Sequence, residues 1–188
     1  DMDNKCGSEN SSKFKSSGNM LRIAGVVKES IVDGPGIRYV VFTQGCPHHC
    51  PGCHNPGTHD FNAGKLVDIK DIEEDIKKNP LIRGVTISGG EPFAQAKTVS
   101  KLIDDLRNNS DKPYDFMVYT GYKFENLVGD ANETNGYMNL LNNTDVLMDG
   151  RFVEALKNEN TIFRGSTNQR AIDIKESLES GEVKLHEF

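Results

Sequence analysis

Short runs of β-branched residues alternate with amphipathic helical patterns along most of this chain. The runs predict strands at about residues 22 to 27, 38 to 43, 83 to 88, 115 to 120 and 144 to 149. Strand and helix in alternation favour parallel βαβ units. In sheets of this kind, the loops after the carboxyl ends of the strands carry the chemistry. Functional residues are therefore expected where these strands end.

Two segments between the strands have apolar residues at helical spacing. In residues 67 to 79 these are Val67, Ile69, Ile72 and Ile76, and in residues 96 to 109 they are Val99, Leu102, Ile103 and Leu106. Both segments are expected to be crossover helices, and Asn79-Pro80 ends the first one because proline cannot continue a helix. Residues 130 to 143 are rich in turn formers at first and predict a loop leading into a short helix.

The length of the chain limits how far such a sheet can extend. The chain has 188 residues, and residues 1 to 19 are rich in Ser, Asn and Lys without periodicity, which predicts a disordered tail or expression remnant. Residues 20 to 188 then form a single domain. A complete eight-fold barrel takes about 250 residues. The expected fold is therefore α/β, a partial, open βα barrel of about five or six parallel units.

Charge and hydropathy argue against two classes of partner. The formal net charge is -6 and no cluster of lysine or arginine is present, which argues against nucleic acid as the main partner. No apolar run approaches the roughly 18 residues of a membrane span, and the N-terminus lacks the apolar stretch of a secretory signal. A cytoplasmic protein is expected, in which cysteines stay as thiols or metal thiolates.

Three of the four cysteines lie in one loop directly after a predicted strand. The segment GCPHHCPGCHN places them at Cys46, Cys50 and Cys53, while Cys6 lies in the tail and is expected to be a simple thiol. Spacings of four and three residues let one loop point three sulfurs at one centre, and thiolate is the usual ligand of iron-sulfur clusters. A four-iron cluster then keeps one iron open, like the open position of a catalytic metal.

Structural zinc is the alternative for this loop. One of His48, His49, His54 or His59 would complete a tetrahedron with the three cysteines. Zinc sets usually place two ligands in each of two separate knuckles, so a single loop favours iron-sulfur. On that reading His48 and His49 are expected to face solvent, and His54 is expected to pack against whatever the open iron holds.

A second loop follows the strand predicted at residues 83 to 88. Gly89, Gly90 and Glu91 could form an ordinary strand-to-helix turn, with the carboxylate near the N-terminus of the next helix. If they lie at the same end of the sheet as Cys46, they predict a binding loop, because glycines let the backbone approach a ligand closely. Glu91 would then offer a negative partner for an ammonium group.

The cysteine spacing, followed by Gly-Gly-Glu on the next unit, resembles the radical S-adenosylmethionine (SAM) enzymes. Further segments are similar to one group within them, the activating enzymes of anaerobic ribonucleotide reductase: VDGPGIRYVVFTQGC, CPGCHNPGTHDF, TISGGEP, VYTGY, LMDGRFVEAL and FRGSTNQRAID. The likeness spans about residues 20 to 174. Each motif alone is moderately specific, and six in order are very specific.

The resemblance implies a cofactor set and a reaction. Cys46, Cys50 and Cys53 would hold a [4Fe-4S] cluster whose open iron binds SAM through its amino and carboxylate groups. Reduction by a low-potential donor such as flavodoxin or ferredoxin would cleave SAM to methionine and a 5′-deoxyadenosyl radical. That radical would take a hydrogen from a glycine of anaerobic ribonucleoside-triphosphate reductase. No side chain is expected to be catalytic, because cluster and SAM carry the chemistry.

The residues expected to contact SAM lie at the ends of several strands. They are Gly52, Cys53, His54, Gly89, Gly90, Glu91, Thr120 and Arg151. For Arg151 two roles stay open. It could bind the SAM carboxylate, or it could lie in a tight turn and form a solvated charge pair with Asp149. For Thr120 and its neighbours, one interpretation is contact with ribose or the methionine carboxylate. The alternative is that one of the adjacent tyrosines, Tyr119 or Tyr122, packs in the core.

Two motifs have no chemical role that the sequence defines. Asp33 to Gly36 form a turn by composition, and Arg164 to Gln169 match the resemblance without a role for each residue. Two other functions stay open at this point. One is activation of pyruvate formate-lyase or another glycyl-radical enzyme, and the other is a zinc-binding interaction module without catalysis.

Overall fold

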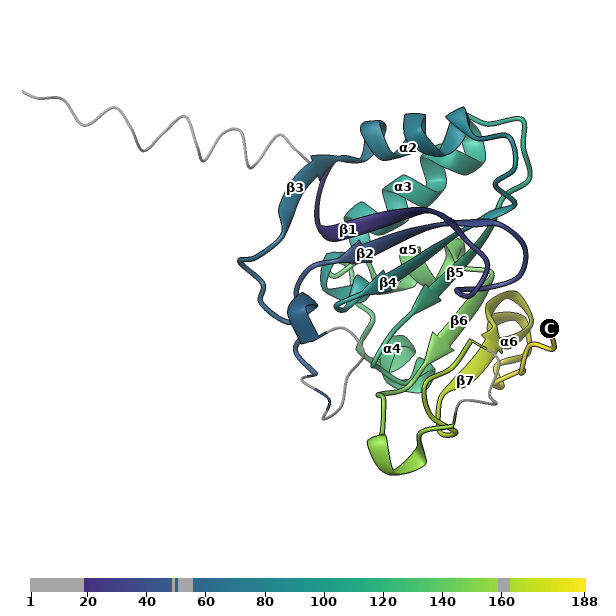
Figure 1. Cartoon of the computed structure of the whole chain (residues 1–188). Helices are drawn as coiled ribbons and strands as arrows, with labels where there is room; N and C mark the ends of the chain where they lie inside the picture. The colour runs from purple at the N-terminus through teal and green to yellow at the C-terminus, as the bar shows by residue number, and fades with distance from the viewer. Residues whose placement is uncertain (1–18, 49, 51–55, 159–162) are drawn as a thin grey trace, which may run out of the picture.

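The computed structural model describes residues 19–48, 50, 56–158 and 163–188. Within them, seven strands form one sheet in the order β3-β1-β2-β4-β5-β6-β7 (Figure 1). The strands are β1 (Met20–Ser30), β2 (Arg38–Thr43), β3 (Lys65–Asp68), β4 (Gly84–Gly89), β5 (Asp115–Tyr119), β6 (Val146–Asp149) and β7 (Arg170–Asp173). Residues 1 to 18 of the predicted tail lie outside the described residues.

The helices of the described chain are α2 (Ile69–Lys78), α3 (Ala96–Asn108), α4 (Phe124–Asp130), α5 (Tyr137–Asn143) and α6 (Ile174–Ser180). Short 3-10 turns occur at Pro56–Thr58, Pro92–Gln95 and Glu154–Leu156. Helices α2 and α3 match the two predicted crossover helices, and α5 matches the predicted short helix. The sequence patterns do not predict α4 and α6, because about two helical turns give a weak periodic signal. Helix α5 is as short, but the turn-rich segment before it marks its place.

Strand direction corrects part of the expected fold. Strands β2, β4, β5 and β6 are parallel neighbours. Strands β1, β3 and β7 each pair antiparallel with their neighbours. The α/β class is confirmed, but the described sheet has four parallel strands instead of five or six parallel units. Parallel neighbours need a crossover of a dozen or more residues, and only residues 31 to 37 join β1 to β2.

Strand β3 occupies the start of a segment that the apolar pattern predicts as helix. Val67 lies in this strand and pairs with Leu21 of β1. Helix α2 begins two residues later than expected because Asp68 caps it, with the side chain accepting a hydrogen bond from the Lys70 amide at 3.0 Å. Strands β3 and β7 have four residues each, which give an alternating pattern few positions. Strand β6 is as short, but its consecutive apolar residues Val146, Leu147 and Met148 mark it.

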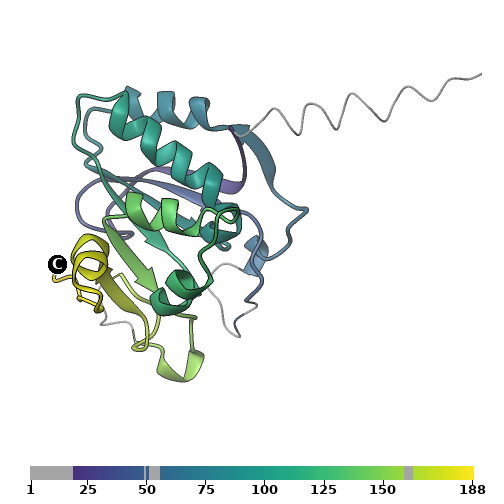
Figure 2. The ribbon, with the colours of Figure 1, turned by 180° about the vertical axis from the view of Figure 1, so that it is seen from behind.

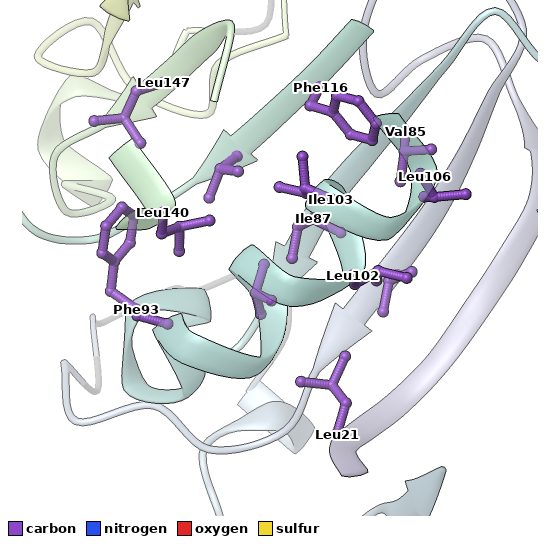
Figure 3. Close-up of a cluster of buried hydrophobic side chains, with 14 of the residues drawn as sticks. Leu21, Val85, Ile87, Phe93, Leu102, Ile103, Leu106, Phe116, Leu140 and Leu147 are labelled. Carbon is purple, nitrogen blue, oxygen red and sulfur yellow. The ribbon is translucent and has the colours of Figure 1, made fainter. Parts of the chain in front are cut away.

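The main core lies between the sheet and helices α2, α3 and α5, which cover one face of it (Figure 2). Ile87 of β4 and Phe116 of β5 pack against Leu102, Ile103 and Leu106 of α3, and all five side chains are fully buried (Figure 3). Burial of each such side chain stabilises the fold by about 1.5–3 kcal/mol. This layer of packed side chains fixes the positions at which the parallel strands end.

No helix of the described chain is long and apolar enough to cross a membrane.

A fully buried arginine anchors the turn before β2. Arg38 forms an ion pair with Asp115 at 2.5 Å, and its Nε donates to the Thr86 hydroxyl at 2.8 Å. Its Nη1 donates to the Pro35 carbonyl at 3.2 Å, and the Thr86 hydroxyl donates to the Asp33 carbonyl at 2.8 Å. The turn predicted at residues 33 to 36 is therefore tied to the sheet interior.

Candidate functional site

A cavity of about 570 Å³ opens at the carboxyl ends of the parallel strands. Its volume lies in the range of roughly 300–1,000 Å³ that is typical of small-molecule sites. The residues that line it include Asp33, Cys46, His48, Cys50, Gly89, Gly90, Thr120, Arg164 and Gln169. These residues come from loops that follow β2, β4, β5 and β6 and from the turn before β2. The cavity therefore lies at the end of the sheet where the sequence predicts the site.

The loop after β2 brings two cysteines to this wall. Cys46 is buried and Cys50 is half-buried, and both line the cavity. Two backbone bonds close the loop, from the Gly45 amide to the Thr58 carbonyl at 2.7 Å and from the Cys46 amide to the His59 carbonyl at 3.1 Å. The predicted site residues that lie outside the described chain are His49, Gly52, Cys53 and His54, so their roles stay predictions.

The two-glycine turn after β4 lies directly against the cysteine loop. The Gly90 amide donates to the Thr43 carbonyl at 2.8 Å, and the Glu91 amide donates to the Gly45 carbonyl at 2.8 Å. A Cβ atom on Gly90 would lie 2.4 Å from the Gly45 carbonyl oxygen, which is closer than real side chains approach. Gly89 has a φ of +93°, which favours glycine. Glycines at these positions allow the two loops to approach each other.

The Glu91 carboxylate is fully buried and accepts hydrogen bonds from four groups. The donors are the Gly121 amide at 2.8 Å, the Phe93 amide at 3.1 Å, the Thr120 hydroxyl at 2.8 and 2.9 Å, and His48 Nε2 at 2.6 Å. A carboxylate needs such partners to remain charged away from water. The side chain of Glu91 is not part of the cavity lining. Its carboxylate joins the loops that follow β2, β4 and β5.

The expectation that His48 faces solvent is wrong. Its side chain is only 3% exposed, because Glu91 holds Nε2 and the ring packs edge-on against Tyr122 at 4.5 Å between ring centroids. Because the Glu91 carboxylate accepts from all its other partners, we assign the proton of this contact to Nε2. Gly121 leaves room for the ring, since a Cβ there would lie 2.4 Å from His48 Cδ2.

The two weaker candidates for SAM contact differ in position. Thr120 lines the cavity, and its hydroxyl is bound to Glu91. Arg151 is exposed and is not part of the cavity lining. The alternative of a solvated pair between Arg151 and Asp149 is wrong, because Asp149 is buried and pairs with Arg170 at 2.5 Å. Strand β7 brings Arg170 beside β6, and the local sequence gives no sign of this pairing.

Two tyrosines near the cavity are neutral phenols at pH 7. Burial raises the pKa of Tyr122 to about 12, and it also raises the pKa of Tyr119 above its usual range. The Tyr119 hydroxyl donates to the Phe163 carbonyl at 2.6 Å. These residues therefore pack and donate hydrogen bonds instead of titrating.

Sequence reasoning misses the roles of His48, Gly121 and Gln169. Gln169 Oε1 accepts from the Gly165 amide at 2.8 Å, and its Nε2 donates to the Gly150 carbonyl at 3.1 Å. The only local signal for His48 is its place between two cysteines. Gly121 and Gln169 lie in segments that show a resemblance but no recognisable chemistry.

Comparison with known proteins identifies the family. The chain matches the model of the 4Fe-4S single cluster domain family over residues 32–172. The anaerobic ribonucleoside-triphosphate reductase-activating protein of Salmonella typhi is 36% identical over 145 residues, which cover 74% of this chain and 90% of the relative. This chain belongs to that family of activating proteins. Its relative from Escherichia coli K12 is 36% identical over 146 residues, with the same coverage of both chains. The relative from Enterobacteria phage T4 is 32% identical over 144 residues, which cover 74% of this chain and 85% of the relative.

The described residues of this family member fit an iron-sulfur cluster. Cys46 and Cys50 line one cavity, and thiolates are the preferred ligands of such clusters. The matched family model, a 4Fe-4S domain, supports iron-sulfur over structural zinc. Cys53 lies outside the described chain, and within that chain no three His, Cys, Asp or Glu side chains form a metal-binding group.

Proposed function

We propose that this chain is a radical SAM activase that generates a glycyl radical on anaerobic ribonucleoside-triphosphate reductase. The observation that carries the proposal is the shared cavity of Cys46, Cys50 and the Gly89-Gly90 turn at the carboxyl ends of parallel strands. The names of the relatives, which describe activation of this reductase, support the choice of target.

In this proposal Cys46, Cys50 and Cys53 hold a [4Fe-4S] cluster with one iron open to SAM. The bound cluster supplies one electron at low potential for the reductive cleavage of SAM. The protein positions the ligands and excludes water. Cys46 is buried and two loops close on it, so little of this residue is exposed to solvent.

The Gly89-Gly90 turn is the proposed backbone contact for the methionine end of SAM. Both glycines line the cavity, and their missing side chains leave the backbone accessible. Glu91 lies behind this turn and holds Thr120 and Gly121 through hydrogen bonds. It acts on the cavity wall through these residues, and its negative charge favours an ammonium group nearby.

The finer fold and the partners belong to the same proposal. We propose that the α/β sheet is an incomplete barrel of the radical SAM type, with its four parallel strands carrying the site. The reducing electron comes from a low-potential carrier such as flavodoxin or ferredoxin. Activation of pyruvate formate-lyase is the competing target, and the names of the relatives favour the reductase over it.

Anaerobic reconstitution tests this function. The protein is loaded with iron and sulfide, reduced and mixed with SAM, and the products are analysed by chromatography. Methionine and 5′-deoxyadenosine are expected, and in the presence of the reductase a glycine-centred radical is expected by EPR. Absence of both products from a cluster-loaded sample contradicts the enzyme function. If methionine and 5′-deoxyadenosine form but the radical appears only on a different glycyl-radical enzyme, the reductase is not the target.

A further inference from the structure

We infer that Arg164 binds the carboxylate of the methionine part of SAM, and that Arg151 does not. This assignment rests on the proposed function and adds a specific residue to it. Arg164 lines the cavity, and among the described lining residues no other arginine or lysine is found. Arg151 is exposed and lies outside the lining.

The charges around the cavity favour such a cation. The wall carries the carboxylate of Asp33, and the buried carboxylate of Glu91 lies behind it. A ligand carboxylate that enters this surrounding meets groups of the same sign unless a cation faces it. Arg164 is the group of the described lining that meets this need.

Unlike the buried Arg38 and the half-buried Arg170, Arg164 has no acidic partner within the described residues. Arg38 pairs with Asp115, and Arg170 pairs with Asp149. For Arg164 the described chain contains no such ion pair, and within it Nη1 of Arg164 donates to the Gln169 carbonyl at 3.0 Å. The charge of Arg164 is therefore not neutralised by the described part of the protein.

The unused edge of the guanidinium suits a carboxylate. Arg164 Nε is buried and has no hydrogen-bond partner in the described structure. Leaving a buried donor unsatisfied is unfavourable, and a ligand that accepts from it removes that cost. Because Nη1 is engaged, Nε and Nη2 remain as a fork that can donate two parallel bonds to one carboxylate.

The backbone on both sides of Arg164 is already fixed by β5 and β6. The Phe163 carbonyl accepts from the Tyr119 hydroxyl at 2.6 Å. The Gly165 amide donates to Gln169 Oε1 at 2.8 Å, and the Gln169 side chain reaches the Gly150 carbonyl at 3.1 Å. A guanidinium held in this way loses little freedom when it binds a ligand.

Equilibrium binding of two ligands to the anaerobic, cluster-loaded protein tests the assignment. The ligands are SAM and decarboxylated SAM, which lacks only the carboxylate. For Arg164→Gln, the affinity for SAM is expected to fall by about 10- to 100-fold, the range for a lost hydrogen bond to a charged group. The affinity for decarboxylated SAM is expected to change less than about twofold. Arg164→Lys is expected to recover part of the loss, because it keeps the charge but not the fork.

Arg83→Gln is the matched control, because Arg83 is an exposed arginine just before β4, at the end of that strand opposite to the cavity. It should bind both ligands like the wild type. Iron and sulfide content is measured for every variant, and if Arg164→Gln fails to load a cluster, the comparison is made with Arg164→Lys. Equal losses for the two ligands, no loss for either, or a selective loss in Arg151→Gln would overturn the assignment. No SAM binding by the loaded wild type would instead overturn the proposed function itself.

Discussion

The imidazole of His48 and the carboxylate of Glu91 form a buried pair, with 2.6 Å between Nε2 and Oε1. The histidine comes from the cysteine loop after β2, and the glutamate follows the glycine turn after β4. The pair therefore links the loop that carries Cys46 and Cys50 to the loop that carries Gly89 and Gly90. Removing one partner of such a pair leaves the other buried without compensation, which is strongly unfavourable.

Substitution Glu91→Gln is expected to lower the free energy of unfolding by about 3 kcal/mol. In the variant, an NH2 group replaces one carboxylate oxygen and faces donors that bind this oxygen in the wild type. The negative charge that these donors stabilise is also lost. Urea unfolding followed by circular dichroism measures the change. Glu133→Gln, at an exposed position of the loop before α5, should stay within about 0.5 kcal/mol of the wild type. Equal stability of the two variants would show that the four hydrogen bonds to Glu91 contribute little.

Substitution Gly90→Ala is expected to separate the cysteine loop from the glycine turn. The new Cβ meets the Gly45 carbonyl oxygen, a backbone atom that cannot move aside without shifting the loop. We expect a loss of stability of about 1–3 kcal/mol and a lower iron content after reconstitution. The control is Gly129→Ala in α4, where no atom lies within 4 Å of the added Cβ and alanine should stabilise the helix by up to about 1 kcal/mol. A fully loaded, stable Gly90→Ala protein would contradict the close approach.

Substitution Cys50→Ala is expected to abolish cluster loading and SAM cleavage without unfolding the domain. The sulfur is a proposed ligand, whereas the core lies between the sheet and helices α2, α3 and α5. Iron and sulfide analysis, combined with circular dichroism, separates loss of the cluster from loss of the fold. Cys6→Ala is the matched control and should load as the wild type does. Wild-type iron and sulfide content in the Cys50→Ala protein would rule out this ligand.

Stability is expected to depend on pH through Glu73. This residue of α2 is buried beside Asp105 of α3, and burial, followed by a hydrogen bond with Asp105, raises the pKa of Glu73 from 4.5 to about 7. A carboxyl group with a raised pKa holds its proton longer in the folded state than in the unfolded state. The free energy of unfolding that it contributes is therefore greatest below pH 4.5 and is lost as the pH rises to about 7.

Substitution Glu73→Gln should remove this dependence and leave a protein that is more stable than the wild type above pH 7. Urea unfolding at several pH values between 4.5 and 8 measures it. Glu74→Gln, at the exposed neighbouring position, should keep the slope of the wild type. A wild-type slope in Glu73→Gln would assign the pH dependence to other groups.

Local patterns predict much of the fold. The spacing of Ile72 and Ile76 identifies α2, and the β-branched runs locate β1, β2, β4, β5 and β6. Such patterns report which residues of one element face the core, because the helical and strand periods are properties of the chain itself. Strand direction is a different matter, since the antiparallel pairing of β1 depends on the length of its connection to β2.

The sequence alone also predicts the place of Cys46, Cys50, Gly89 and Gly90 at the ends of parallel strands, because each of these segments directly follows its strand along the chain. Only the tertiary structure decided that Glu91 and His48 are buried together, that Asp149 takes Arg170 as its partner, and that Arg164 lines the cavity while Arg151 is exposed. Each of these outcomes depends on which distant segments meet in space. Burial and partners determine whether a charged side chain binds a ligand or stabilises the fold, and neither is a property of the residue itself.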